Sequence, residues 1–293
     1  MPGGLPVNNC FQEHQSCHFE FRLRDASSIT GSNRATATDM CLVVVAFNVH
    51  ADHPIVVAAN RDEFHARPTT AADWWSDQPD IVAGRDLQAG GTWLGLHRSG
   101  RFATVTNFRD AKTSSGKLRS RGHLVTEFLL SEKTPLEYLH TIAADDYSGF
   151  NLLLADSTSL AYLSNRGGEV LELTAGIYGL SNATLDTPWE KVERSKTRLG
   201  DVLRQGPAND TQLLRLLDDR EKGPVSEVRS ERLPFATAHA ITAPFIVTPE
   251  YGTRCSTVVR ADHQGHWQLL ERRFDAAGNN TGESRFSFRT GVD

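Results

Sequence analysis

Predicted strands and helices come in blocks along this chain, and their order restricts the fold more than any other feature of the sequence. Runs of β-branched residues predict strands, and periodic leucines with capping residues predict helices. The predicted strands cover residues 42–47, 55–59, 92–96, 101–107, 150–155, 160–163, 170–173, 177–180, 256–260, 267–272 and 285–288. The predicted helices lie at 123–130, after Thr134, after Thr187 and around 213–217. Blocks of strands followed by blocks of helices, twice over, predict an α+β fold with layers around antiparallel sheets.

The chain changes character at Met40. Residues 1–39 are rich in Pro, Gly, Asn, Ser and Thr and lack a periodic apolar pattern, so they predict a disordered extension. The apolar segment 42–47 begins a folded region that no internal repeat or long linker interrupts, and residues 40–290 are therefore predicted to form one domain. Two origins of the extension fit the sequence. Either translation starts at Met40, or the extension is real and is removed later.

Composition narrows the class of protein. The chain has 293 residues, with 31 Lys and Arg against 36 Asp and Glu, and its net charge of -5 disfavours nucleic acid as a partner. Its apolar runs are far shorter than the roughly 20 residues that a membrane-spanning helix needs. Four cysteines without a Cys-x-x-Cys pair indicate a reducing compartment. We expect a soluble, cytoplasmic protein with a small-molecule substrate or ligand.

The common motifs for cofactors and metals are absent from the sequence. It contains no phosphate-binding loop, no dinucleotide fingerprint and no His-Glu-x-x-His. His263 and His266 have a spacing that suits a metal ion, but Gly265 between them favours a hairpin turn. We therefore expect no cofactor and no metal site.

A polar cluster with the sequence Asn-Arg-Asp-Glu, residues 60–63, directly follows the apolar segment 55–59. Alone, the cluster is more typical of a turn in which Asp62 caps the backbone and Arg61 makes a surface ion pair. A simple hairpin of the first two strands, however, places Cys41 opposite Asp62, and a slip of one or two residues keeps it near the cluster. The cysteine favours a chemical role for these residues.

A thiol attacks only as the thiolate, so it needs a base or a cationic neighbour. Arg61 offers the charge. If Met40 initiates translation, removal of that methionine exposes Cys41 with a free α-amino group, which suits a general base at neutral pH. Asp62 would orient that amine. The plainer alternative is a small buried cysteine at the start of a strand.

The order of several motifs resembles the NRDE family of transport and Golgi organisation proteins. The family signature is the cluster at 60–63. The other matching segments are 67–68, 90–95, 106–109, 120–122, 149–153, 179–182, 185–189 with 191–192, and 251–254 with 256–257. Family members begin Met-Cys, which this sequence matches internally at 40–41. The resemblance covers nearly all of residues 40–290.

The resemblance implies the fold of the N-terminal nucleophile hydrolases, a four-layer αββα sandwich whose first residue attacks an amide. In the cholylglycine hydrolase branch, a cysteine works with a carboxylate, with asparagines of an oxyanion hole and with an arginine on a later strand. Cys41, Asp62, Asn182 and Arg254 are similar in position, and these are the implied catalytic residues.

The implied binding residues are the rest of the cluster and one further oxyanion candidate. They are Asn60, Arg61, Glu63 and Asn107.

The first functional hypothesis is a cysteine amidohydrolase acting on a small or acyl-bearing C–N amide bond. The alternative is a non-enzymatic carrier or trafficking factor for haem or for lipid and acyl-CoA groups. It rests on the resemblance, because animal members are linked to Golgi organisation, haem movement and mitochondrial lipid metabolism. A third hypothesis, a thiol redox sensor, requires Cys41 and Cys255 to come within disulfide reach.

Overall fold

The computed structural model describes residues 40–108, 118–228 and 233–291. The extension predicted to be disordered, residues 1–39, lies outside the described residues. None of the described helices combines the length and the apolar character needed to cross a membrane.

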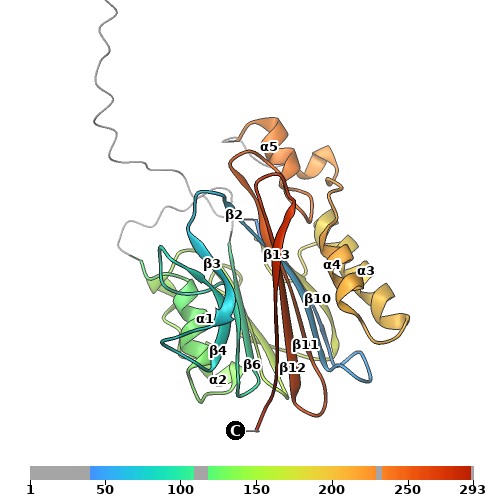
Figure 1. Ribbon diagram of the computed structural model, residues 1–293. Coiled ribbons are helices and arrows are strands. Elements are labelled where there is room, and N and C mark those ends of the chain that lie inside the picture. The colour runs from blue at the N-terminus through green and yellow to red at the C-terminus, as the bar shows by residue number, and fades with distance from the viewer. Residues whose placement is uncertain (1–39, 109–117, 229–232, 292–293) are drawn as a thin grey trace, which may run out of the picture. The chain divides into compact units, whose positions relative to one another are not determined.

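Two antiparallel sheets form the centre of the fold (Figure 1). Sheet A has the order β10-β1-β2-β11-β12-β13, with β1 Leu42–Phe47, β2 Ile55–Phe64, β10 Gly176–Leu180, β11 Tyr251–Ala261, β12 His266–Phe274 and β13 Asn280–Arg289. Sheet B has the sequential order β3-β4-β5-β6-β7-β8-β9, with β3 Thr69–Trp74, β4 Ile81–Asp86, β5 Leu94–His97, β6 Arg101–Asn107, β7 Phe150–Ala155, β8 Leu160–Ser164 and β9 Leu171–Leu173.

Helices cover the outer face of each sheet. Sheet B packs against α1 Gly122–Leu129 and α2 Pro135–Leu139, and sheet A against α3 Glu190–Arg204 and α4 Asp210–Leu217. The remaining helices are α5 Phe235–Ala240 and the short 3-10 turns Ala144–Asp146 and Val225–Glu227. A third apolar cluster lies between the two sheets. The predicted four-layer αββα sandwich is confirmed.

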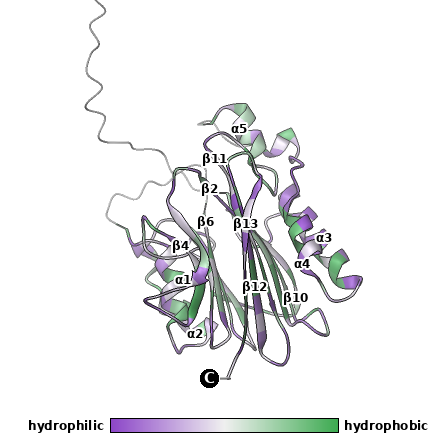
Figure 2. Ribbon diagram, in the orientation of Figure 1, coloured by the Kyte–Doolittle hydropathy of each residue, from purple (hydrophilic) through white to green (hydrophobic). Residues whose placement is uncertain are grey.

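Strand β1 shows why the sandwich forms. All six of its residues are apolar and buried. Val43 and Val45 belong to the core between the sheets, whereas Leu42 and Val44 pack against the helices α3 and α4. Those helices have one apolar face, and Figure 2 shows apolar and polar residues mixed along both of them. A strand that is apolar on both faces therefore lies in an inner layer of the fold.

Local capping explains where the shorter helices begin. Thr134 and Glu137 form the predicted capping box of α2, with Pro135 in the first turn. The start predicted at Thr187 is wrong, because α3 begins at Glu190 after Trp189. The hydroxyl of Thr187 instead donates to the carbonyl of Thr184, 2.7 Å away, and so closes a turn rather than capping the helix.

Three differences in the strands shape the site. Strand β2 continues through the polar cluster to Phe64, and β3 and β4 were not expected at all. Residues 177–180 were expected in a meander with 170–173, but β10 crosses to sheet A and pairs with β1, with Leu180 opposite Val43. This crossover places the residues after β10 beside the start of β1.

Candidate active site

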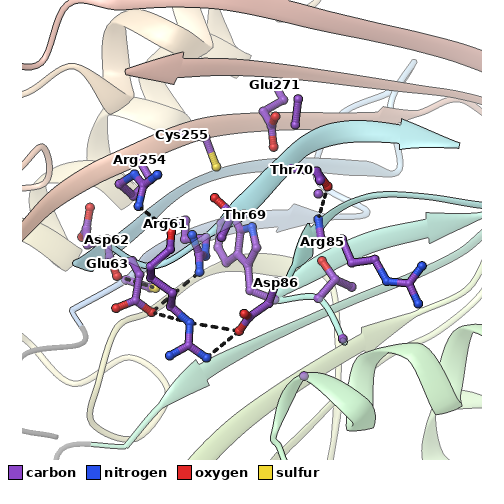
Figure 3. A pocket seen from close by; sticks show the side chains of 18 of the residues that line it. Arg61, Asp62, Glu63, Thr69, Thr70, Arg85, Asp86, Arg254, Cys255 and Glu271 are labelled. Carbon is purple, nitrogen blue, oxygen red and sulfur yellow. Dashed lines mark hydrogen bonds and ion pairs between the residues drawn. The ribbon is translucent and has the colours of Figure 1, made fainter. Parts of the chain in front are cut away.

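A cavity of ≈ 260 Å³ lies where the ends of β1, β2 and β11 face β3, β4 and β6 across the two sheets (Figure 3). Its described lining includes two thiols, Cys41 and Cys255. The charged side chains of the lining are Arg61, Asp62, Glu63, Arg67, Arg85, Asp86, Arg121, Arg254, Glu271 and Arg273. The predicted cluster at 60–63 therefore borders a cavity, through three of its four residues.

Cys41 immediately precedes β1 and is 8% exposed. Its Sγ lies 3.9 Å from the carbonyl oxygen of Asp62. The predicted register is wrong by one residue, because Leu42 pairs with Asn60 and the next position on β2 opposite Cys41 is Arg61. The length of the turn causes this shift, because the ladder between β1 and β2 ends at the pair Phe47 and Ile55 and the loop between them has seven residues.

Asp62 is a buried carboxyl group with an incomplete set of partners. It is 2% exposed, and Oδ1 accepts a hydrogen bond of 2.6 Å from the hydroxyl of Thr253 on β11. Within the described part of the chain, Oδ2 accepts none. Burial raises the pKa of Asp62 to about 7, although the positive charge of Lys191 and the Thr253 hydrogen bond oppose that rise. A buried carboxyl with this pKa titrates near neutral pH.

The β10 crossover brings two side chains to the start of β1. Ser181 Oγ lies 2.7 Å from the carbonyl oxygen of Cys41 and 3.1 Å from Oδ1 of Asn182. Asn182 is 1% exposed, and its Nδ2 donates to the carbonyl of Asn107, the last residue of β6, at 2.7 Å. The two predicted oxyanion candidates are therefore neighbours, joined by a hydrogen bond between the sheets.

Arg254 lies at an irregularity in β11. Thr253 pairs with Asp62 and Cys255 pairs with Arg61, so Arg254 is the additional residue of a β-bulge. Its Nη1 donates to the carbonyls of Phe64, His65 and Arg67 at 2.8, 3.2 and 3.2 Å. Burial, and then the charge of Arg61, lower the pKa of Arg254. The side chain thus holds the turn after β2 and borders the cavity.

Arg61 and Glu63 share the inner face of β2. Glu63 Oε2 lies 3.6 Å from Nη2 of Arg61 and 3.5 Å from Nε of Arg67, and Arg67 also bonds to Asp86 on β4. Figure 3 shows this chain of ion pairs crossing the cavity from sheet A to sheet B. The network joins the two sheets at the rim of the cavity.

Asn60 does not line the cavity. Its side chain points to the helical side of sheet A, where Nδ2 donates to the carbonyls of Leu217 and Pro244, both at 2.9 Å. Its Oδ1 accepts a 2.6 Å bond from Ser256. The expected binding role fails for a physical reason, because all polar atoms of this buried amide are engaged in structural bonds.

Four further residues belong to the site or support it, and of these the sequence suggested a role for Cys255 alone, as a disulfide partner. Lys191 is a 1% exposed lysine in the first turn of α3, and Thr253 holds Asp62. Cys255 and Glu271 line the inner end of the cavity. Burial, and then the nearby Glu271, raise the pKa of the Cys255 thiol well above its usual value. The matching segments 191–192 and 251–254 contain Lys191 and Thr253, whereas Cys255 and Glu271 lie outside the matching segments.

Neither Cys41 nor Cys255 forms a disulfide. Cys41 lies at the start of β1 and Cys255 on β11, with β2 between them, and two strand spacings amount to about 10 Å. A disulfide needs Cα atoms within about 7 Å. The redox-pair hypothesis is therefore wrong for this arrangement.

The described residues contain no group of three or more His, Cys, Asp or Glu side chains arranged to hold a metal. Gly265 has a φ of 76° in the turn between β11 and β12, as its predicted hairpin role requires. His266 bonds through Nε2 to the hydroxyl of Ser287 on the neighbouring strand.

The fold and the site together define an αββα sandwich with a cysteine thiol at the start of strand β1, beside a charged cavity. Residues 40–276 match the family model described as Transport and Golgi organisation 2. The chain is 35% identical over 256 residues to the Transport and Golgi organization protein 2 homolog of Bos taurus, covering 80% of this chain and 92% of the relative. It is 34% identical over 262 residues to the Homo sapiens homolog, with the same coverage. The chain belongs to the Transport and Golgi organisation 2 family.

Two solved structures have a similar arrangement. One is penicillin V acylase from Agrobacterium tumefaciens, with 13% identity, a TM-score of 0.49 and coverage of 85% of this chain and 86% of that one. The other is the Caenorhabditis elegans ortholog of N-acylethanolamine-hydrolyzing acid amidase, with 13% identity, a TM-score of 0.45 and coverage of 74% and 92%.

Proposed function

We propose that this protein is a cysteine amidohydrolase that cleaves a small or acyl-bearing C–N amide bond. The observation that carries the proposal is the contact between the Cys41 thiol and Asp62. The thiol lies 3.9 Å from the Asp62 backbone, and the buried carboxyl has one oxygen without a hydrogen-bond partner among the described residues. Burial raises the pKa of this carboxyl to about 7, a value that suits proton chemistry at neutral pH.

The reaction begins at the sulfur. The Cys41 thiolate attacks the amide carbonyl, the C–N bond then breaks, and the amine leaves with the proton that the thiol gave up. Water hydrolyses the thioester and regenerates the thiol. If Cys41 is the first residue of the mature chain, its α-amino group carries this proton, and the open oxygen of Asp62 accepts a hydrogen bond from that amine.

The asparagine pair suits the developing negative charge. Nδ2 of Asn182 has two hydrogens, and the carbonyl of Asn107 accepts one of them. The other supplies a donor for an oxyanion beside Cys41. Ser181 fixes the carbonyl of Cys41 and contacts Asn182, so the nucleophile and this donor are held by one short segment.

The first test is intact mass and N-terminal sequencing of the protein from its native host, followed by the pH dependence of thiol alkylation. We expect a chain that starts at Cys41, and alkylation at Cys41 that is fast near neutral pH. Cys255→Ala is the matched control, since it removes the other thiol of the cavity. A chain that keeps residues 1–39, with Cys41 alkylating like an ordinary thiol, rules out the amine as base.

The second test is turnover. Chromogenic amides with short and long acyl groups are offered to the wild-type protein, Cys41→Ala and Cys255→Ala. We expect hydrolysis by the wild type and Cys255→Ala only, with a thioester on Cys41 visible by mass spectrometry after rapid acid quenching. Equal activity in Cys41→Ala contradicts the proposal.

A carrier remains the second candidate, because the same cavity is a ready binding site. Among the ligands considered, haem fits poorly. The described lining contains no histidine, so only its thiols could be axial ligands, and ten of its residues carry charged side chains, whereas haem needs an apolar pocket. An acyl thioester that binds Cys41→Ala as well as the wild type, with no turnover by either, favours the carrier.

We also propose a cytoplasmic location. A catalytic thiol has to stay reduced, and neither described cysteine forms a disulfide. A tagged protein at its native level, located by cell fractionation, tests this placement; recovery from an oxidising compartment contradicts it.

A further inference from the structure

The guanidinium groups of Arg61 and Arg254 face the same cavity from neighbouring strands, with Cys255 directly opposite Arg61 in the ladder (Figure 3). Burial, and then the charge of Arg61, lower the pKa of Arg254, and the charge of Glu63 opposes this only in part. Two like charges in one cavity repel each other, and an anion between them relieves that repulsion.

Arg254 has an open pair of donors. Its hydrogen bonds all use Nη1 and all go to backbone carbonyls, and no carboxylate of the described residues lies within ion-pair distance. The Nε and Nη2 hydrogens are left for a ligand. These two positions form the fork that grips both oxygens of a carboxylate.

Arg61 is also incompletely compensated. Its side chain is 11% exposed, and among the described residues the one carboxylate within ion-pair distance is Glu63, at 3.6 Å, which Arg67 shares. That distance is too long for a hydrogen bond. A largely buried guanidinium with no hydrogen bond from the described residues has its full donor capacity available to a ligand.

We propose that Arg61 and Arg254 form an anion subsite, and that the substrate carries a carboxylate close to its scissile amide. The subsite adds a substrate class to the proposed amidohydrolase function. That the bound carboxylate is a substrate rests on this proposed function. A carboxylate suits the subsite better than a phosphate, because Glu63 borders it and repels a second negative charge. The bidentate grip of Arg254 and the charge of Arg61 then orient the carbonyl toward Cys41.

The experiment measures binding, not turnover, so that it stands apart from catalysis. Full-length protein with Cys41→Ala is titrated by calorimetry with N-decanoylglycine and with N-decanoylglycinamide, a neutral analogue of nearly the same shape. We expect the carboxylate to bind at least about tenfold more tightly, as a charge-assisted bond pair implies. In Arg254→Gln and in Arg61→Gln the two ligands are expected to bind within about twofold of each other.

Three controls keep the result interpretable. Arg254→Lys keeps the charge but lacks the fork, and we expect it to restore part of the preference. Arg85→Gln changes a cavity arginine that is already paired with Asp77, at 2.7 and 2.8 Å, and is expected to keep the full preference. Arg61→Gln breaks no hydrogen bond, so it tests the subsite even if Arg254→Gln fails to fold.

Equal binding of the two ligands to the parent protein overturns the subsite, and so does a preference that both glutamine variants retain. If N-decanoylaminomethylphosphonate binds more tightly than N-decanoylglycine, and the glutamine variants lose this binding, the assignment to a carboxylate is wrong. If the carboxylate is bound selectively but the wild-type protein shows no turnover, the amidohydrolase proposal is wrong and the subsite proposal holds. If the wild type turns over amides but binding is not selective, the subsite proposal is wrong and the amidohydrolase proposal holds.

Discussion

The carboxylate of Glu271, on β12 of sheet A, accepts a hydrogen bond of 2.8 Å from the backbone N–H of Ala72 on β3 of sheet B. Apolar side chains, the ion pairs at the rim and the hydrogen bond from Asn182 to Asn107 also join the two sheets. Glu271 is 4% exposed, and burial raises its pKa. A buried acceptor therefore fixes the inner end of the cavity.

Two substitutions of Glu271 should distinguish how much its hydrogen bond and its charge each contribute to the free energy of unfolding. We expect Glu271→Ala to lower the free energy of unfolding by about 1–3 kcal/mol, because the N–H of Ala72 stays buried without an acceptor. Glu271→Gln keeps an acceptor oxygen and removes the charge, and should cost clearly less. Urea unfolding of both variants checks this. A larger loss in Glu271→Gln would mean that the ionised form stabilises the fold.

The buried carboxyl of Asp62 should make stability depend on pH. Its folded pKa of about 7 lies above the unfolded value of 3.8, so the folded chain holds the proton more tightly. The stabilisation is complete below the unfolded pKa and is lost as the pH rises through 7. We expect the free energy of unfolding of the wild type to fall between pH 4 and pH 8 relative to Asp62→Asn. Urea titrations at four pH values measure the difference. A flat dependence over this range would show that Lys191 keeps Asp62 ionised throughout.

Asn60 should behave as a structural residue. Asn60→Ala leaves the carbonyls of Leu217 and Pro244 and the hydroxyl of Ser256 without their buried partner, and we expect a loss of about 2–3 kcal/mol in unfolding free energy. Ser256→Ala removes one of the three bonds and should cost about 1 kcal/mol. Thermal unfolding compares the two. An unchanged melting temperature in Asn60→Ala would return this residue to the list of binding candidates.

The layer order was predictable from local patterns, because strands such as β1 are apolar on both faces and such strands belong in inner layers. Strands β3 and β4 escaped prediction for the converse reason. Half of β3 is only partly buried, and its threonines line the cavity, so it lacks a continuous apolar run. The hairpin placed Cys41 near residues 60–63 from counting alone, but the seven-residue loop shifted the register by one.

The rest of the site depends on contacts that no local pattern contains. Asn182 reaches the start of β1 only because β10 changes sheets, and the bulge at Arg254 is visible only in the ladder with β2. Lys191 reads as an ordinary surface charge in the first turn of an amphipathic helix, yet it is buried beside the site. The family resemblance supplied Asn182 and Arg254, and it gave no reason for their geometry.

Asn182 provides the sharpest test of the proposed chemistry. If its free amide hydrogen stabilises the oxyanion, Asn182→Ala should lower kcat by about a hundredfold or more while KM changes little, because the contact forms fully only in the transition state. Asn182→Ala also removes the bond to the carbonyl of Asn107, so part of any loss is structural. Ser181→Ala is the matched control, since it loosens the same segment without removing the donor.

The two explanations differ in what they change. A structural effect lowers thermal stability and slows thiol alkylation in both variants alike. An oxyanion effect leaves alkylation of Cys41 intact in Asn182→Ala, because alkylation by iodoacetamide creates no oxyanion, and it abolishes only amide turnover. If Ser181→Ala and Asn182→Ala lose activity equally, the asparagine positions the strand end rather than the charge, and the stabilising donors must be backbone N–H groups near Cys41.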